Sequence, residues 1–215
     1  MILMDNSLKT TTLGGNYALP SDYSTSNSKT ISSMPIISST AKVNRDSFVC
    51  SSTVDKSFGN VEDTIERIAK WFLGKSAMSH KKLQKLCYYA YAWYIVFAND
   101  VEAIEMYPDD IKTLTSQKFQ AWIHGPVNPL LYQKYKKYGW SEIPQEIEFL
   151  GFPQQITDLL EQVWSAYGEF SADELEAISH SEFPWQNARQ NLAPSDSCAN
   201  VIDDCDILRY YSTLR

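Results

Sequence analysis

The chain has 215 residues, of which 44% are hydrophobic and 13% aromatic, so it can bury the core of one ordinary domain and still carry a tail. Its formal net charge is −7, and the part after residue 60 holds 14 basic against 22 acidic groups, a balance of −8. That acidic balance argues against a broad phosphate-binding face, and therefore against nucleic acid as a partner.

Residues 1–60 are rich in Ser, Thr and Asn and contain few aromatic side chains. A segment with so little apolar surface cannot offset the conformational entropy that it would lose on folding. We therefore expect a disordered N-terminal tail over residues 1–60, followed by one domain over residues 61–215.

Cysteine usage and apolar runs bear on the compartment. The four cysteines form neither a CxxC pair nor a metal-type spacing, which fits a reducing environment. No secretory leader is evident, and the longest uncharged apolar run, residues 86–98, is shorter than the roughly 20 residues that span a bilayer. We expect a soluble, cytoplasmic protein without a membrane partner.

Two helices are predicted at the start of the domain. Apolar side chains recur at helical spacing between residues 61 and 73, and Gly74 is a stop signal. Ser79 is a suitable N-cap for the next helix, and Met78 and Leu83 occupy the positions of a hydrophobic staple. Beyond residue 86 this second helix is apolar almost all round, which predicts a central helix covered on several sides.

The middle of the chain is predicted to be less regular. Residues 99–118 are polar and interrupted by a proline, so we expect a connection there. Residues 118–123 alternate weakly, as a short strand would. Gly125 and Pro126 then turn the chain, and Pro126 is placed to open a helix that Gly139 ends.

Four further helices are predicted toward the C-terminus. An apolar stripe runs through residues 156–167, and Ser171 with Glu174 forms a capping box for the following helix. His180 lies at the end of that helix, where a cation is favoured, and Pro184 begins a short helix. A last helix covers roughly residues 204–214. The fold class is therefore mainly α: a compact single helical domain with at most a short β element.

Two catalytic or metal arrangements are conceivable. Cys87 and His124 could form a nucleophile pair, although a thiolate is disfavoured inside an apolar helix. His124, His180 and Glu182 could bind a metal, although nothing in the sequence fixes their geometry. The simpler interpretation of His124 is structural, because an imidazole before Gly-Pro can fix a sharp turn. We expect no catalytic residue, no metal and no cofactor.

Three motifs, in this order along the chain, resemble the Panacea domain family, also called SocA-like antitoxins and earlier described as phage-associated proteins. They are residues 82–86 with Tyr88 and Tyr89, residues 121–127 with Tyr132, and residues 180–185. The resemblance covers about residues 65–214. The family often has Thr before the histidine of the third motif, where this chain has Ser179.

The resemblance implies an antitoxin of a toxin-antitoxin system, which neutralises a cognate toxin protein by direct binding and needs no cofactor. One member of the family instead acts as an adaptor that delivers its toxin to a cytoplasmic protease, so such a protease is an alternative partner. An uncharacterised enzyme or a DNA-binding regulator is a third alternative, which the acidic charge and the lack of a helix-turn-helix pattern oppose.

We expect the second and third motifs to lie near each other and to border the toxin-binding surface. Rigid aromatic side chains beside a turn offer a large contact area at low entropic cost, as interface anchors commonly do. The expected partner-binding residues are Trp122, His124, Gly125, Pro126, Lys136, Lys137, Pro184 and Trp185. The alternative is that both tryptophans belong to the core.

Overall fold

The computed structural model describes residues 64–215 except 147–150, 191 and 194. The tail expected over residues 1–60 lies outside the described residues. Eight α-helices and four short strands are found in the described part, so the mainly helical fold class is confirmed. None of the described helices combines the length and the apolar character needed to cross a bilayer.

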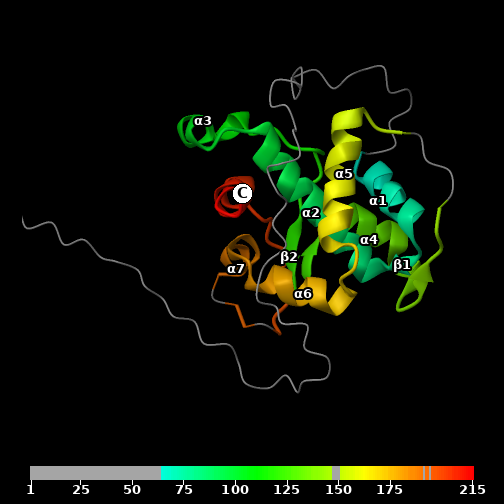
Figure 1. The fold of residues 1–215 in the computed structure, drawn as a ribbon. Helices are drawn as coiled ribbons and strands as arrows, with labels where there is room; N and C mark the ends of the chain where they lie inside the picture. Colours follow the sequence, from blue (N-terminus) through cyan, green and yellow to red (C-terminus); the bar gives the residue numbers. More distant parts are fainter. Residues whose placement is uncertain (1–63, 147–150, 191, 194) are drawn as a thin grey trace, which may run out of the picture. The chain divides into compact units, whose positions relative to one another are not determined.

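Helix α2 (His80–Ala98) is the central element, and other helices pack against several of its sides (Figure 1). Nearly all of its side chains from residue 83 to residue 97 are buried, as its apolar sequence predicts. The helices around it are α1 (Thr64–Lys75), α4 (Pro129–Tyr135), α5 (Gln154–Tyr167), α6 (Ala172–Ser181) and α8 (Asp204–Ser212). Burying so many apolar side chains on one helix makes α2 the main source of hydrophobic stabilisation.

Local signals set the start of α2. The Ser79 hydroxyl accepts a hydrogen bond of 3.3 Å from the backbone N–H of Lys82, which confirms Ser79 as the N-cap. Just before it, strand β1 (Met78–Ser79) pairs antiparallel with strand β4 (Glu142–Ile143). The capping bond and the strand pair together fix where the central helix begins.

Aromatic contacts join α2 to the C-terminal helices. The rings of Tyr89 and Tyr167 stack with centroids 3.9 Å apart, and the Trp93 indole N–H donates to the Tyr167 hydroxyl over 3.1 Å. From α8, Asp204 accepts a 2.7 Å hydrogen bond from the Tyr91 hydroxyl. The hydroxyls of Tyr91 and Tyr167 form hydrogen bonds inside the core while their rings pack as apolar groups, so these contacts add directional order to the packing.

The segment expected to be a plain connection, residues 99–118, contains a helix. Helix α3 (Val101–Met106) is followed by the 3-10 turn η2 (Pro108–Asp110). The Asp100 carboxylate accepts hydrogen bonds from the backbone N–H groups of Glu102 and Ala103 and so caps α3. This N-cap explains the difference, because an Asp cap can start a short helix that has few apolar positions.

The expected helix opening at Pro126 is wrong. Strand β2 (Gln120–Trp122) pairs with strand β3 (Gly125–Val127) as a hairpin, and Pro126 lies inside β3. Helix α4 begins three residues later, where the Asn128 side chain accepts from the backbone N–H groups of Leu130 and Leu131. The weak alternation before the turn did predict β2; the strand after the turn was missed.

The C-terminal helices follow their predicted boundaries closely. Helix α5 is capped by Gly168, and the Ser171–Glu174 capping box at the start of α6 is confirmed. Pro184 lies in the first turn of α7 (Phe183–Arg189). After α7, residues 200–202 run beside β2, where the backbone N–H of Ala121 donates to Asn200 over 2.9 Å. The hairpin is thereby enclosed between α2 and the C-terminal part of the domain.

Candidate functional site

Side chains of α2 form hydrogen bonds with strand β3 of the hairpin and with Asn128 just after it. Lys85 donates to the carbonyl of Pro126 over 3.1 Å, and Gln84 binds both backbone groups of Asn128, accepting at 2.8 Å and donating at 3.2 Å. Gln84 therefore bonds to Asn128 as a neighbouring strand would. These bonds occupy backbone groups that an edge strand would otherwise leave open.

Lys85 reaches this position at an electrostatic cost. Only 1% of its surface is exposed, and burial lowers the pKa of its ammonium group to about 7. A buried lysine is tolerated when its polar end is hydrogen-bonded, as it is here to Pro126. Lys85 is therefore an internal brace of the hairpin.

Gly125 is required where the hairpin approaches Lys85 and α6. Its φ of +90° is a conformation that residues with a Cβ rarely adopt. A Cβ at this position would lie 2.6 Å from Lys85 Cε and 2.7 Å from the Ser179 hydroxyl. The Gly-Pro pair of the second motif thus permits close packing on both sides.

His124 lies at the tip of the hairpin, where 63% of its side chain is exposed. Its Nδ1 is 3.0 Å from the Glu176 carboxylate of α6. Glu176 also forms an ion pair with Lys81 of α2, and Lys81 binds Asp173 at 2.6 Å. Burial alone would raise the pKa of Glu176, but the hydrogen bonds from Lys81 and His124 lower it below its usual value. The tip is therefore fixed to α6 by an ionised carboxylate.

The third motif contacts the second directly. The Trp185 indole N–H donates to the carbonyl of Trp122 over 3.0 Å, and Arg189 donates to Ala121 over 3.1 Å. On its other face Trp185 stacks against His180, with ring centroids 4.0 Å apart. The second and third motifs, joined here by residues 63 apart in sequence, therefore form one structural unit, and Trp185 connects them.

His180 does not act as the cation expected at a helix end. Burial, with smaller contributions from the charges of Lys85 and Arg189, lowers the pKa of its imidazole to about 4 despite the opposite effect of Glu176. The ring is neutral at pH 7. Desolvation against Trp185 therefore outweighs the favourable helix-end position that the sequence suggested.

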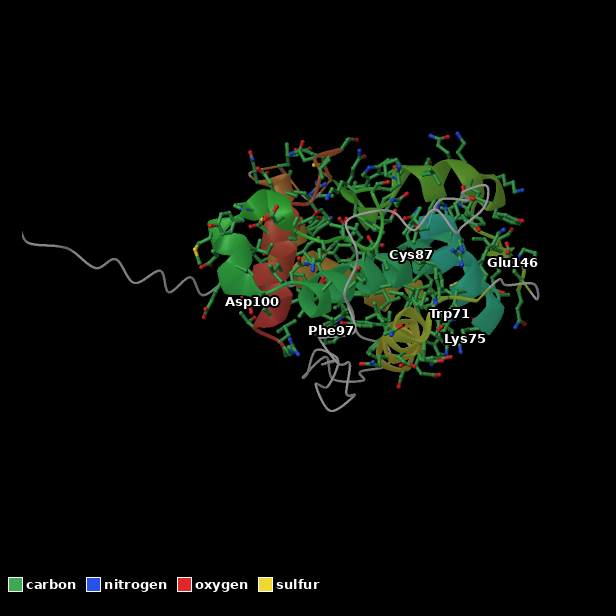
Figure 2. All side chains as sticks on the ribbon, turned by 90° about the horizontal axis from the view of Figure 1, so that it is seen from above. Trp71, Lys75, Cys87, Phe97, Asp100 and Glu146 are labelled. Atoms are coloured by element: carbon green, nitrogen blue, oxygen red, sulfur yellow. The ribbon has the colours of Figure 1, made fainter. Side chains whose placement is uncertain are left out.

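Neither conceivable chemical arrangement is found. Cys87 lies fully buried within α2 (Figure 2), and burial raises the pKa of its thiol, whereas His124 is bound to Glu176 at the exposed tip. Glu182 points away from the histidines, into a cluster of tyrosines, where it accepts a 2.6 Å hydrogen bond from Tyr211. Within the described ranges no group of three or more His, Cys, Asp or Glu side chains could hold a metal.

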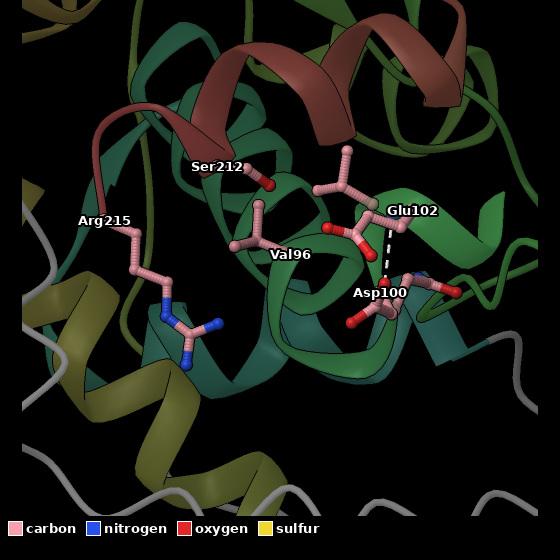
Figure 3. A pocket seen from close by; sticks show the side chains of 7 residues that line it. Val96, Asp100, Glu102, Ser212 and Arg215 are labelled. Atoms are coloured by element: carbon pink, nitrogen blue, oxygen red, sulfur yellow. Dashed lines mark hydrogen bonds between the residues drawn. The ribbon is translucent and has the colours of Figure 1, made fainter. Parts of the chain in front are cut away.

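A recess also lies at the opposite end of α2. It is lined by Val96, Asn99, Asp100, Val101, Glu102, Ser212 and Arg215 (Figure 3). Its Asp100 carboxylate caps α3, and the lining includes no histidine, cysteine or lysine.

The expected partner-binding residues divide by exposure. The buried ones, which shape the hairpin and the connection between the second and third motifs, are Gly125, Pro126, Pro184 and Trp185. Those that reach solvent are Trp122, which is half-buried, and His124, Lys136 and Lys137, which are exposed. The two lysines lie in the 3-10 turn η3 (Lys136–Tyr138), just after α4.

Sequence reasoning missed several residues of this site. Lys85 and Gln84 were part of a recognised motif, but their roles depend on backbone groups some 40 residues away. Glu176 stands four residues before His180, a spacing that places both on one face of a helix and could have drawn attention to it. Phe183, with 48% of its surface exposed beside Trp185 in sequence, was also overlooked.

Comparisons with known proteins agree with the motifs. Residues 83–186 match the family described as "Antitoxin SocA-like, Panacea domain", a segment that contains all three motifs except Lys82. The chain is 29% identical over 136 residues to Antitoxin SocA of Caulobacter vibrioides (strain NA1000 / CB15N). The matched part covers 55% of this chain and 66% of that relative, just under two thirds of its length. No solved structure matches the chain.

Proposed function

Because residues 83–186 form a domain of the SocA-like Panacea family, we propose that the protein is an antitoxin that neutralises a cognate toxin protein by direct binding. The observation that carries this proposal is the match to the family model, which covers all three motifs except Lys82. The curated relative is named an antitoxin, which supports the same assignment.

The surface proposed for toxin contact is the hairpin tip with its neighbour on α7. We call it the hairpin surface, and define it as Trp122, Ile123, His124 and Phe183. Its residues are half-buried or exposed, and the tip is held by the Glu176 bond and by Trp185 behind it. Rigid aromatic and aliphatic side chains on a fixed backbone lose little entropy on binding, as effective interface anchors require.

The charge of the chain suits this role. A net charge of −7 accelerates encounters with a basic protein and slows encounters with nucleic acid. A basic toxin is therefore the kind of partner that the surface would meet fastest. Delivery of the toxin to a protease remains the alternative outcome of binding.

The test is co-expression with the protein encoded by the adjacent reading frame. Phe183→Asp places a charge on the hairpin surface, yet a carboxylate in the first turn of α7 is favourable for the helix. Tyr107→Asp, at an exposed position just after α3, is the matched control. We expect the wild type and the control to restore growth and Phe183→Asp to lose rescue while staying folded by circular dichroism.

Two outcomes would change the proposal. If the wild type fails to restore growth against the neighbouring protein, the antitoxin function is contradicted. If growth is restored but the half-life of the toxin falls sharply when the antitoxin is present, delivery to a protease replaces neutralisation by binding.

A further inference from the structure

The turn that follows α4 exposes an unusual set of side chains. Lys136 and Lys137 are exposed in η3, and Trp140 beyond it has 95% of its surface in contact with solvent. We call Lys136, Lys137 and Trp140 the tip surface. It lies on the turn after α4 and is distinct from the hairpin tip at His124. A large aromatic side chain that is this open, beside two exposed lysines, offers a contact area that a protein partner can bury.

The backbone holds this turn in a defined shape. Gly139 donates to the carbonyl of Lys136 over 3.1 Å, and Ser141 donates to that of Tyr138 over 2.9 Å. Gly139 has a φ of 53°, which allows the reversal, and two residues after the turn β4 is paired with β1. Trp140 is therefore presented from a short, hydrogen-bonded turn.

The lysines of the tip surface have no carboxylate partner among the described residues. Lys136 bonds to the neutral side chain of Gln133 at 2.5 Å, and Lys137 lies over the Tyr138 ring at 5.2 Å. Elsewhere in the described residues, carboxylates pair with the lysines at positions 75, 81, 118 and 134. In a chain of net charge −7, two lysines without a carboxylate partner among the described residues make a local reversal of charge.

The tip surface continues from the hairpin surface. Trp122 contacts Tyr132 of α4, with ring centroids 4.8 Å apart. The backbone N–H of Lys136 bonds to the carbonyl of Tyr132, so Lys136 lies one helical turn beyond that contact. One partner with an ordinary interface of about 800 Å² on each side can cover both surfaces.

We propose that the tip surface docks the same partner as the hairpin surface, by inserting Trp140 into an apolar pocket rimmed by carboxylates. The pocket would contain a hydrogen-bond acceptor, because the Trp140 indole N–H, which is open to water in the free chain, would leave water on insertion. The carboxylates would pair with Lys136 and Lys137. This inference rests on the proposed antitoxin function and gives the toxin a specific feature: an acidic rim on an otherwise basic protein.

Other occupants fit the tip surface less well. Nucleic acid would be repelled by the acidic balance of the domain, and two lysines neutralise few phosphates. Binding to an anionic membrane generally needs a cluster of about four to eight basic residues. A protein pocket needs only one aromatic anchor and a few complementary charges.

The test uses the full chain and the purified protein of the adjacent reading frame, with affinity and association rate measured at several salt concentrations. Trp140→Ala is expected to weaken binding at least about 30-fold, as loss of a central tryptophan anchor does. Lys136→Glu with Lys137→Glu is expected to slow association about tenfold and to reduce its salt dependence. Tyr107→Ala, an exposed aromatic residue at the other end of α2, is the matched control and should bind like the wild type.

The outcomes separate this inference from the proposed function. If the wild type does not bind the neighbouring protein, both are overturned. If the wild type binds and Trp140→Ala binds equally well, the tip inference alone is overturned. Tighter binding of the wild type to a single-stranded oligonucleotide or to anionic vesicles, lost in Trp140→Ala, would also overturn it by assigning the surface to another occupant.

Discussion

Replacing Glu182 with Gln tests the buried side of the third motif. Glu182 is both the C-cap of α6 and the N-cap of α7. Its carboxylate accepts a hydrogen bond from the Tyr211 hydroxyl within the aromatic core. Burial raises the pKa of this carboxyl from 4.5 to about 8, against the opposing effect of the hydrogen bond from Tyr211. The folded protein therefore holds a proton that the unfolded chain releases at neutral pH.

Because the folded state binds this proton more tightly, the free energy of unfolding decreases as the pH rises. The stabilising contribution of the proton is complete below pH 4.5 and is lost as the pH rises through about 8. At about 1.4 kcal/mol per pH unit, the two units between pH 5.5 and 7.5 correspond to at most about 2.7 kcal/mol. Glu182→Gln cannot bind this proton. Its free energy of unfolding should therefore increase by about 2 kcal/mol relative to that of the wild type as the pH rises over this range.

Urea denaturation at a series of pH values measures this difference. His80 and His180, whose pKa values burial lowers to about 4, and Lys85, whose pKa burial lowers to about 7, titrate in both chains and cancel in the comparison. Glu142→Gln, at an exposed position, controls for the loss of one carboxylate. Parallel stability profiles of the wild type and Glu182→Gln would refute the reasoning, because Glu182 would then be ionised in the folded state.

Three further predictions concern the turns and the tail. Gly125→Ala should lower the free energy of unfolding by about 2–5 kcal/mol, and Gly139→Ala by about 1–2 kcal/mol. Both glycines have a positive φ, but only at Gly125 would a Cβ clash with packed side chains. Equal losses of stability in thermal denaturation of the two variants would argue against that clash. His124→Ala should cost less than about 1 kcal/mol in urea denaturation, since its bond to Glu176 is largely exposed, and a loss above 2 kcal/mol would indicate a buried role. Deleting residues 1–60 should leave the melting temperature within a few degrees of the full chain, and a large decrease would show that this segment takes part in folding.

The helices were predictable because their signals are local. The periodicity of α1 and α5, the Ser79 cap and the Ser171–Glu174 box all lie within a few residues of the structure that they specify. The hairpin was not predictable in this way. Pro126 is acceptable at a helix start, but it pairs with Ala121 of β2 as part of a strand. Lys85, 41 residues earlier on α2, binds its carbonyl, and that contact is not visible in the local sequence.

The same distinction applies to the candidate site. The second and third motifs were expected to lie near each other, and the hydrogen bond from Trp185 to Trp122 shows that they do. The charge states were not predictable, because the neutral His180 and the protonated Glu182 depend on burial by other elements. Trp140 was missed because an aromatic residue after a glycine is as typical of the core as of an exposed turn.

The central claim, neutralisation by direct binding, is tested most directly with two purified proteins and nothing else. The full chain is mixed with the protein of the adjacent reading frame, and complex formation and the activity of that toxin are measured together. We expect a stable complex in which the toxin is inactive without any protease present. Absence of a complex, or inhibition that appears only after a protease is added, would contradict it.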